Sequence, residues 1–293
     1  MLRSLFLSYA LLVATPVLAA SPALLPAQAG IETRDSWRRP IEPFRIAERS
    51  WYVGTEGLAA VLIRTDAGAV LIDGGLPQAA GHVLEQLRKL GVGPGELKWI
   101  VFSHAHFDHA GPVAEIARAT GAQIAANAES AALLARGGSD DVHFGDRLLF
   151  PPAQADRLLL DGESIELGDL RLTMHATPGH TPGSQSWTWT DTVDGRPTRI
   201  AYADSLSAPD YRLIDHARYP RIVEDYRRGF AAVRALPCDL LLTPHPEASG
   251  WATADAANRH PRPERCAAYA DGAEKRFDAQ LETQRASGQP GAR

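Results

Sequence analysis

The strongest constraint on the fold is the segment Ser103–Gly111, where four side chains able to bind a metal ion fall within six residues, His104-Ala105-His106-Phe107-Asp108-His109. This segment directly follows Trp99–Phe102, an apolar run that predicts a buried strand, and it precedes a helix opened by Pro112. Open α/β sheets carry their sites at this position, the carboxyl end of a strand. The sequence therefore predicts an α/β fold with a metal site at one sheet edge.

The spacing within this segment indicates ligands for two neighbouring ions. His104 and His106 are two residues apart and can point the same way along an extended loop, whereas the adjacent Asp108 and His109 must diverge. A single His-x-His pair is weak evidence, but the full His-x-His-x-Asp-His pattern is specific. The alternative is a polar surface loop, which does not explain why imidazoles gather directly behind a buried strand.

Composition is that of an ordinary globular protein. Of the 293 residues, 45% are hydrophobic and 22% are charged, which excludes disorder, collagen and a disulfide-stapled miniprotein. The net charge of −5 and the lack of a long basic block disfavour nucleic acid and anionic lipid as partners. A chain of this size supports one large domain or two closely packed halves.

Residues 1–19 are predicted to be a secretory signal peptide, because Arg3 precedes an apolar run that ends in the small-residue pattern Val17-Leu18-Ala19. A membrane anchor is the alternative, but it needs about 20 apolar residues, and this run is shorter. We therefore expect a mature chain of residues 20–293, without a membrane anchor, in the periplasm or outside the cell.

An exported protein can form disulfides, and this chain has two cysteines, Cys238 and Cys266. A single disulfide that pins the last helix to the body is the preferred interpretation. Two free buried thiols are one alternative. Two zinc ligands are another, although neither cysteine belongs to a close Cys pair.

Helical and strand patterns alternate along the chain, which indicates α/β organisation in two αβ halves that meet near residues 150–162. The helices are expected at 77–90, 112–119, 128–136, 221–236 and 266 to about 281. The strands are expected at 50–53, 59–64, 69–73, 99–102, 123–126, 163–167, 170–176, 186–190, 198–203 and 240–243.

The histidine-rich segment resembles that of the metallo-β-lactamase superfamily, and two further histidines match that family. His180 lies in Thr177–Ser184, and His245 lies in Leu241–Pro246. The resemblance implies an αβ/βα four-layer sandwich with the site between two β-sheets and two zinc ions per subunit. The implied ligands are His104, His106 and His180 for the first zinc ion, and Asp108, His109 and His245 for the second.

Within the superfamily the chain is most similar to β-lactamases of subclass B3, and closely to the tetrameric type. The similarity is carried by Gly137–Asp141, Gly179–Ser184, Tyr202–Pro209 and Leu242–Pro246. The position where subclass B1 has a zinc-binding Cys falls at or beside Ser205. Leu160 stands where the tetrameric type would have a Met, so a homo-oligomer remains an open expectation.

The resemblance implies zinc-dependent hydrolysis of the lactam amide of penicillins, cephalosporins and carbapenems by a metal-bound hydroxide, and hence antibiotic resistance. A small-molecule β-lactam is then the expected partner. Asp108 would orient the nucleophile, and the Tyr211 hydroxyl is a candidate donor to the developing oxyanion. Ser205 and Ser207 would bind the substrate carboxylate or its bridging water. From its place in the loop, Phe144 is expected to line the apolar side of the cleft, with packing at the domain edge as the alternative.

Several alternatives stay open at this level. Asp204 could orient a ligand or bridge both metals, as an Asp does in thioester hydrolases of the glyoxalase II type. A related zinc hydrolase of lactones or thioesters is the nearest rival function, and a non-catalytic periplasmic zinc-binding protein is a remoter one. Each three-residue ligand set leaves an open metal position, which favours catalysis. The chain has no Ser-x-x-Lys and no Gly-x-Ser-x-Gly, so serine hydrolases lack their nucleophile.

Overall fold

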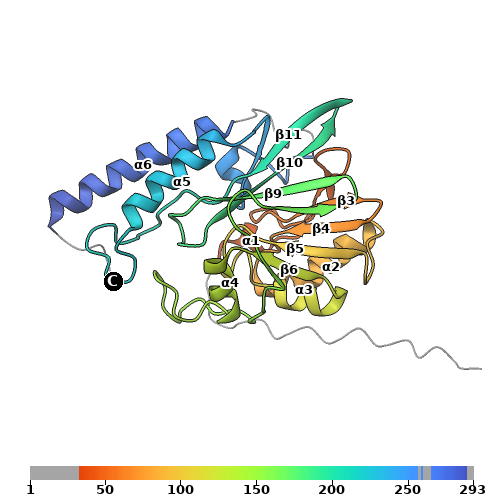
Figure 1. The fold of residues 1–293 in the computed structure, drawn as a ribbon, viewed down its shortest axis with the longest axis horizontal. Coiled ribbons are helices and arrows are strands. Elements are labelled where there is room, and N and C mark those ends of the chain that lie inside the picture. The colour runs from red at the N-terminus through yellow and green to blue at the C-terminus, as the bar shows by residue number, and fades with distance from the viewer. Residues whose placement is uncertain (1–32, 257–258, 260–264, 289–293) are drawn as a thin grey trace, which may run out of the picture.

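The computed structural model describes residues 33–256, 259 and 265–288 (Figure 1). The predicted signal peptide, residues 1–19, lies outside the described residues. Among the helices of the described part, none combines the length and the apolar character needed to cross a membrane.

Two β-sheets form the centre of the molecule. The first is a seven-stranded sheet in the order β1-β2-β3-β4-β5-β6-β7, and the second is a five-stranded sheet in the order β12-β11-β10-β9-β8. The strands are β1 Phe44–Arg45, β2 Ser50–Tyr52, β3 Val61–Thr65, β4 Gly68–Ile72, β5 Leu97–Val101, β6 Gln123–Ala126, β7 Arg157–Leu158, β8 Ser164–Leu167, β9 Leu170–Ala176, β10 Gln185–Val193, β11 Arg196–Tyr202 and β12 Leu240–Leu242.

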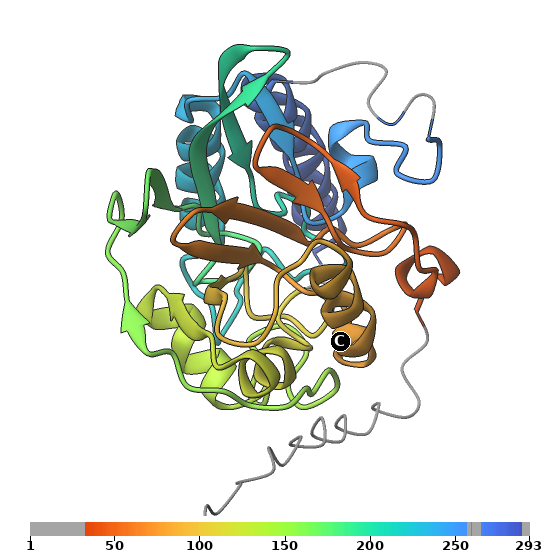
Figure 2. The same cartoon turned by 90° about the vertical axis from the view of Figure 1, so that its right-hand side faces the viewer.

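Helices cover the outer faces of both sheets (Figures 1 and 2). α2 and α3 pack on the first sheet, and α5 and α6 lie side by side on the second. The helices are α1 Asp35–Arg38, α2 Ala80–Lys89, α3 Val113–Thr120, α4 Ala128–Ala135, α5 Ile222–Ala235 and α6 Cys266–Ser287, with 3-10 turns η1 Pro77–Ala79 and η2 Pro246–Ser249. The predicted αβ/βα four-layer sandwich is confirmed.

The central strands are buried on both faces, because each sheet is covered by helices outside and by the other sheet inside. In β4, Val70 and Ile72 point into the core between the sheets, while Ala69 and Leu71 point toward the helices. This alternation follows from the two-residue period of a strand. It explains why such strands read in the sequence as nearly continuous apolar runs.

The differences from the predicted elements are local. The helix expected at 77–90 begins as the 3-10 turn η1, and α6 runs to Ser287 instead of ending near Leu281. The extension has a physical reason, since Gln284 in the added turn makes hydrogen bonds to the loop around Tyr211. The short elements α1, β1 and β7 have too few residues to carry a periodic pattern.

A disulfide joins Cys238 to Cys266, so the preferred interpretation of the two cysteines is confirmed. Cys266 is the first residue of α6, and Cys238 stands two residues before β12. The bond therefore fixes the start of the last helix next to the strand that leads to His245. The free-thiol and zinc-ligand alternatives are wrong.

We predict that Cys238→Ser lowers the free energy of unfolding by about 3.5 kcal/mol, because the closed loop restricts the unfolded chain. Guanidinium unfolding followed by circular dichroism measures this difference, and the reduced wild-type protein is the control. An unfolding midpoint equal to that of the oxidised wild type would contradict the prediction.

Candidate metal centre

The candidate site lies where strands of both sheets end. β5 of the first sheet leads into the loop that carries His104 and His106. β9 and β12 of the second sheet lead to His180 and His245. β9 and β11 both pair antiparallel with β10, and β12 runs parallel to β11, so β9, β11 and β12 share one direction and their carboxyl ends meet at one edge. The two sheets thus contribute residues far apart in sequence to one place.

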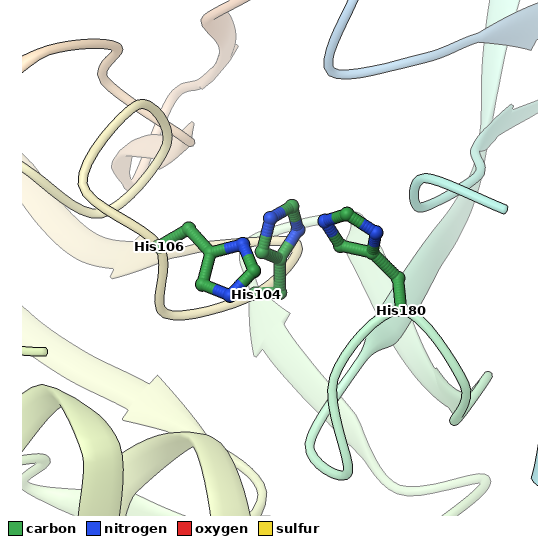
Figure 3. A group of neighbouring side chains, drawn as sticks. All are labelled: His104, His106 and His180. Carbon is green, nitrogen blue, oxygen red and sulfur yellow. The ribbon is translucent and has the colours of Figure 1, made fainter. Parts of the chain in front are cut away.

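The first predicted ligand set is gathered into one group. His104, His106 and His180 each offer a ligand atom, and these atoms all lie within 4.8 Å of one another. Figure 3 shows the three rings turned toward a common centre, His104 and His106 from one loop and His180 from another. All three side chains are buried.

Two of these rings are held by a hydrogen bond from one nitrogen, and the third faces a carboxylate. His104 Nδ1 donates to Asp204 Oδ1 at 2.8 Å, and His180 Nδ1 donates to the carbonyl oxygen of Ser207 at 2.8 Å. His106 Nε2 lies 3.4 Å from Asp141 Oδ2. His104 Nε2 is buried and has no hydrogen-bond partner among the described residues. A buried, unpartnered imidazole nitrogen within a histidine cluster fits a metal ligand, because such a nitrogen is otherwise costly.

The second predicted ligand set also comes together. Asp108 Oδ2 lies 3.3 Å from His109 Nε2 and 3.5 Å from His245 Nε2. The rings of His109 and His245 are 4.9 Å apart. His104, Asp108 and His109 offer ligand atoms within 4.8 Å of one another, so the second group adjoins the first.

Burial and neighbouring charges set the protonation of the site. Burial holds the pKa of both His104 and His180 well below the usual range, and the neighbouring histidines add to this shift. These rings are therefore neutral, the form that binds metals. Burial opposes ionisation of Asp108, but the charge and hydrogen bond of His109 outweigh it and lower the pKa of this carboxyl.

Asp204 lies beside the candidate ligand His104. Its Oδ1 accepts hydrogen bonds from His104 Nδ1 and, at 2.7 Å, from the backbone N–H of Ser205. Burial raises the pKa of Asp204 to about 7. A carboxylate in this position orients the imidazole and raises its basicity, which favours the orienting role over the bridging one.

The remaining predicted site residues lie around the histidines. The Phe144 ring is 5.2 Å from His106, and the Tyr211 ring is 5.5 Å from His180. Ser205 is buried, whereas Ser207 is exposed and contributes its carbonyl oxygen to His180.

Sequence reasoning missed Asp73, which follows β4 and is fully buried. Its carboxylate accepts hydrogen bonds from the Ser103 N–H at 2.7 Å, the Ser103 hydroxyl at 2.8 Å and the Tyr202 hydroxyl at 2.7 Å. His109 Nδ1 lies 3.5 Å from the same carboxylate. The detectable signal was a carboxylate directly after a buried strand.

Asp141, His143 and Trp37 were also missed as parts of the site. The Asp141 carboxylate accepts backbone hydrogen bonds from His143 and Phe144, which shapes the loop beside His106. The His143 ring stacks on Tyr211 with centroids 3.5 Å apart, and the Trp37 ring lies 5.2 Å from His245.

Residues 54–245, which span all six predicted ligands, match the family model described as metallo-beta-lactamase superfamily. The chain belongs to this superfamily. Membership supports a metal-dependent hydrolase, and the clustered His and Asp side chains of this member fit a divalent metal.

Solved structures of this superfamily are similar over most of the chain. Metallo-beta-lactamase MIM-1 from Novosphingobium pentaromativorans is 41% identical with a TM-score of 0.79, over 89% of this chain and 97% of that chain. BJP-1, a subclass B3 metallo-beta-lactamase of Bradyrhizobium japonicum, is 35% identical with a TM-score of 0.78, over 87% and 98%. A Cronobacter sakazakii metallo-beta-lactamase HARLDQ motif mutant is 37% identical with a TM-score of 0.81, over 88% and 100%.

Curated relatives of this superfamily member match a shorter region. A hydroxyacylglutathione hydrolase of Anaeromyxobacter dehalogenans is 35% identical over 44% of this chain and 40% of that protein. An acyl-coenzyme A thioesterase, MBLAC2 of Gallus gallus, is 33% identical over 32% and 38%. The aligned region thus spans less than half the length of these two relatives.

We predict that His106→Ala lowers the bound zinc by about one ion per chain, because the first ligand set loses one of its three side chains. Mass spectrometry of metal content after dialysis measures this. His175→Ala is the control, since His175 lies on β9 ahead of His180 but its Nε2 is hydrogen-bonded to Thr188. Unchanged zinc content in His106→Ala would refute the ligand assignment.

We further predict that Asp204→Ala weakens zinc binding by about 10- to 100-fold, because His104 Nδ1 loses the acceptor that orients its ring. Competition with a chromophoric chelator gives the zinc dissociation constant. Equal constants for the variant and the wild type would show that Asp204 does not act through His104.

Proposed function

We propose that this protein is a subclass B3 β-lactamase that uses two zinc ions to hydrolyse the lactam amide of penicillins, cephalosporins and carbapenems. One observation carries the proposal: two adjoining ligand groups, His104-His106-His180 and Asp108-His109 with His245, lie in one site beside Phe144 and Tyr211. Similarity to solved metallo-beta-lactamases over most of the chain supports it.

The two ligand groups would hold one zinc ion each. Zinc, when bound, lowers the pKa of water and so supplies a nucleophile near neutral pH. Asp108 is the carboxylate available to orient that water: His109 keeps it ionised in the metal-free chain, and the charge of a bound zinc ion would do so once His109 is a neutral ligand. Asp204, Asp73 and Asp141 face His104, His109 and His106 and hold those rings in place.

The Tyr211 hydroxyl is suited to meet the oxyanion that develops on the lactam carbonyl. It is buried and has no hydrogen-bond partner among the described residues, so its proton is available to a substrate. Burial raises the pKa of Tyr211 well above the usual range, which keeps the hydroxyl protonated as a donor. A fixed donor in a site with little water contributes most where negative charge develops.

Substrate groups away from the reacting amide need their own contacts. Ser205 and Ser207 would hydrogen-bond the carboxylate of the β-lactam, and Phe144 would pack against its apolar part. All three lie on loops, Phe144 between α4 and β7 and the two serines after β11.

A thioester or lactone hydrolase is the second candidate, because the curated relatives include a hydroxyacylglutathione hydrolase and an acyl-coenzyme A thioesterase. Both reactions need the same activated water and the same oxyanion donor. The similarity to those relatives covers less than half of each protein, whereas the similarity to metallo-beta-lactamase structures covers nearly all of each structure.

We also propose that the protein acts in the periplasm after cleavage of residues 1–19. The disulfide Cys238–Cys266 supports this, because such bonds persist in oxidising compartments. Cell fractionation and N-terminal sequencing of the mature chain test it, and an uncleaved chain in the cytosol would oppose it.

We predict that the purified mature protein hydrolyses a penicillin and a carbapenem when zinc is present. A chelator should abolish turnover and a clavulanate-type inhibitor should leave it unchanged, since no serine nucleophile takes part. Loss of the lactam absorbance measures the rate. If zinc binds but neither lactam opens, the β-lactamase proposal fails, and thioesters and lactones become the substrates to test.

Tyr211→Phe is predicted to lower kcat by about a hundredfold with little change in zinc content, because only the oxyanion donor is removed. Steady-state kinetics with a carbapenem, together with metal analysis of the same sample, measure both quantities. An unchanged kcat would exclude Tyr211 from the reaction.

A further inference from the structure

Residues 204–213 form an irregular loop that carries three of the proposed site residues, Ser205, Ser207 and Tyr211. We name this segment the substrate loop. It contains no helix and no strand, so its backbone groups have no regular partners. Backbone N–H and C=O groups that are buried need partners from elsewhere.

α6 supplies those partners along one face. The Tyr269 hydroxyl donates to the Asp204 carbonyl at 3.1 Å and accepts from the Leu206 N–H at 3.2 Å. Gln280 Nε2 donates to the Ala208 carbonyl at 2.9 Å. Residues 269, 273, 277, 280 and 284 recur at three- and four-residue spacing, so they share one side of the helix.

α6 also contacts the backbone of Tyr211. Its carbonyl oxygen accepts from Gln284 Nε2 at 2.7 Å and from Gln280 Nε2 at 3.3 Å. The Oε1 of Gln284 accepts from the Leu213 N–H at 2.8 Å. One glutamine thus bonds the loop on both sides of Arg212, which fixes the peptide groups next to Tyr211.

The Tyr211 side chain is fixed separately. Its ring stacks on His143 with an interplanar angle of 7° and lies 5.5 Å from the ring of His180. Stacking fixes the plane of the ring, but the ring can still slide within that plane. The backbone contacts of Gln280 and Gln284 restrain that remaining movement and so the depth of the hydroxyl in the site.

We propose that Gln280 and Gln284 are positioning residues that act on catalysis through Tyr211. This inference rests on the proposed function, because it assigns the oxyanion donor to Tyr211. Both glutamines lie on the helix, outside the candidate metal ligands, so their loss leaves the metal groups intact. Misplacement of a reacting group by about 1 Å can cost about a hundredfold in rate.

The test uses two variants. Gln284→Met keeps the side-chain length and removes both the donated and the accepted hydrogen bonds of the Gln284 side chain. Gln280→Met removes the hydrogen bonds that Gln280 donates to the loop. Glu282→Met is the matched control, because Glu282 is exposed on the same turn of α6. All three are made in the full-length zinc-loaded protein. We expect unchanged zinc content in each, and a loss of about tenfold in kcat with unchanged KM for Gln284→Met.

A double-mutant cycle separates positioning from general stability. In the Tyr211→Phe background, Gln284→Met should change kcat by less than about twofold, because the group it positions is already absent. A loss of kcat as large in that background as in the wild type would overturn the proposal.

Hydrogen exchange provides a reading that does not depend on β-lactamase activity. We expect the peptide that covers residues 206–213 to exchange faster in Gln284→Met and Gln280→Met than in the wild type. In Glu282→Met its exchange should be unchanged. Exchange equal to that of the wild type in both glutamine variants would overturn the proposal. If the wild type turns over no lactam, only the proposed function fails, and the exchange result still decides whether the glutamines hold the loop.

Discussion

The site depends on hydrogen bonds that fix the two sheets relative to each other, and one group of them lies directly beside His104. The Phe102 carbonyl, just past β5 of the first sheet, accepts from the Gln185 side chain at 2.8 Å and from the Trp187 indole at 3.0 Å. The backbone N–H of Gln185 donates to the Ser103 carbonyl at 2.9 Å. β10 of the second sheet is thereby tied to the residue directly before His104. Ligands from two sheets can meet only if this spacing is fixed.

Gathering these polar groups has an electrostatic cost, and the surrounding carboxylates offset it. Burial disfavours a charged imidazole, and each buried imidazole nitrogen without a partner adds a desolvation penalty. Asp204 accepts a hydrogen bond from His104, and Asp73 and Asp141 place a negative charge 3.5 and 3.4 Å from one nitrogen of His109 and His106. Metal binding would remove the remaining penalty, so we expect metal affinity and folding stability to be coupled.

The sequence predicts the parts of this arrangement that are local. The His-x-His-x-Asp-His segment follows a strand whose apolar run is evident, and His180 and His245 follow similar strands. Asp141 and Gln284 could not be found in this way, because their partners are 35 and 71 to 73 residues distant along the chain. Asp73 directly follows the apolar strand β4, but only the fold shows its partner Ser103, 30 residues further on. Aspartates in turns and glutamines on helices are common, and the local sequence does not show which of them contact a site. Only the tertiary fold shows these contacts.

α6 carries the disulfide at one end and the contacts to the loop around Tyr211 at the other. The disulfide fixes its first residue, Cys266, whereas Gln284 lies 18 residues later, about 27 Å along the helix axis. Between them, Phe277 and Leu281 pack into the core shared with α5. Loss of the disulfide therefore frees the end near Tyr269 first, while the apolar contacts keep the end near Tyr211 in place. Stability and the position of Tyr211, the proposed oxyanion donor, are accordingly controlled from opposite ends of one helix.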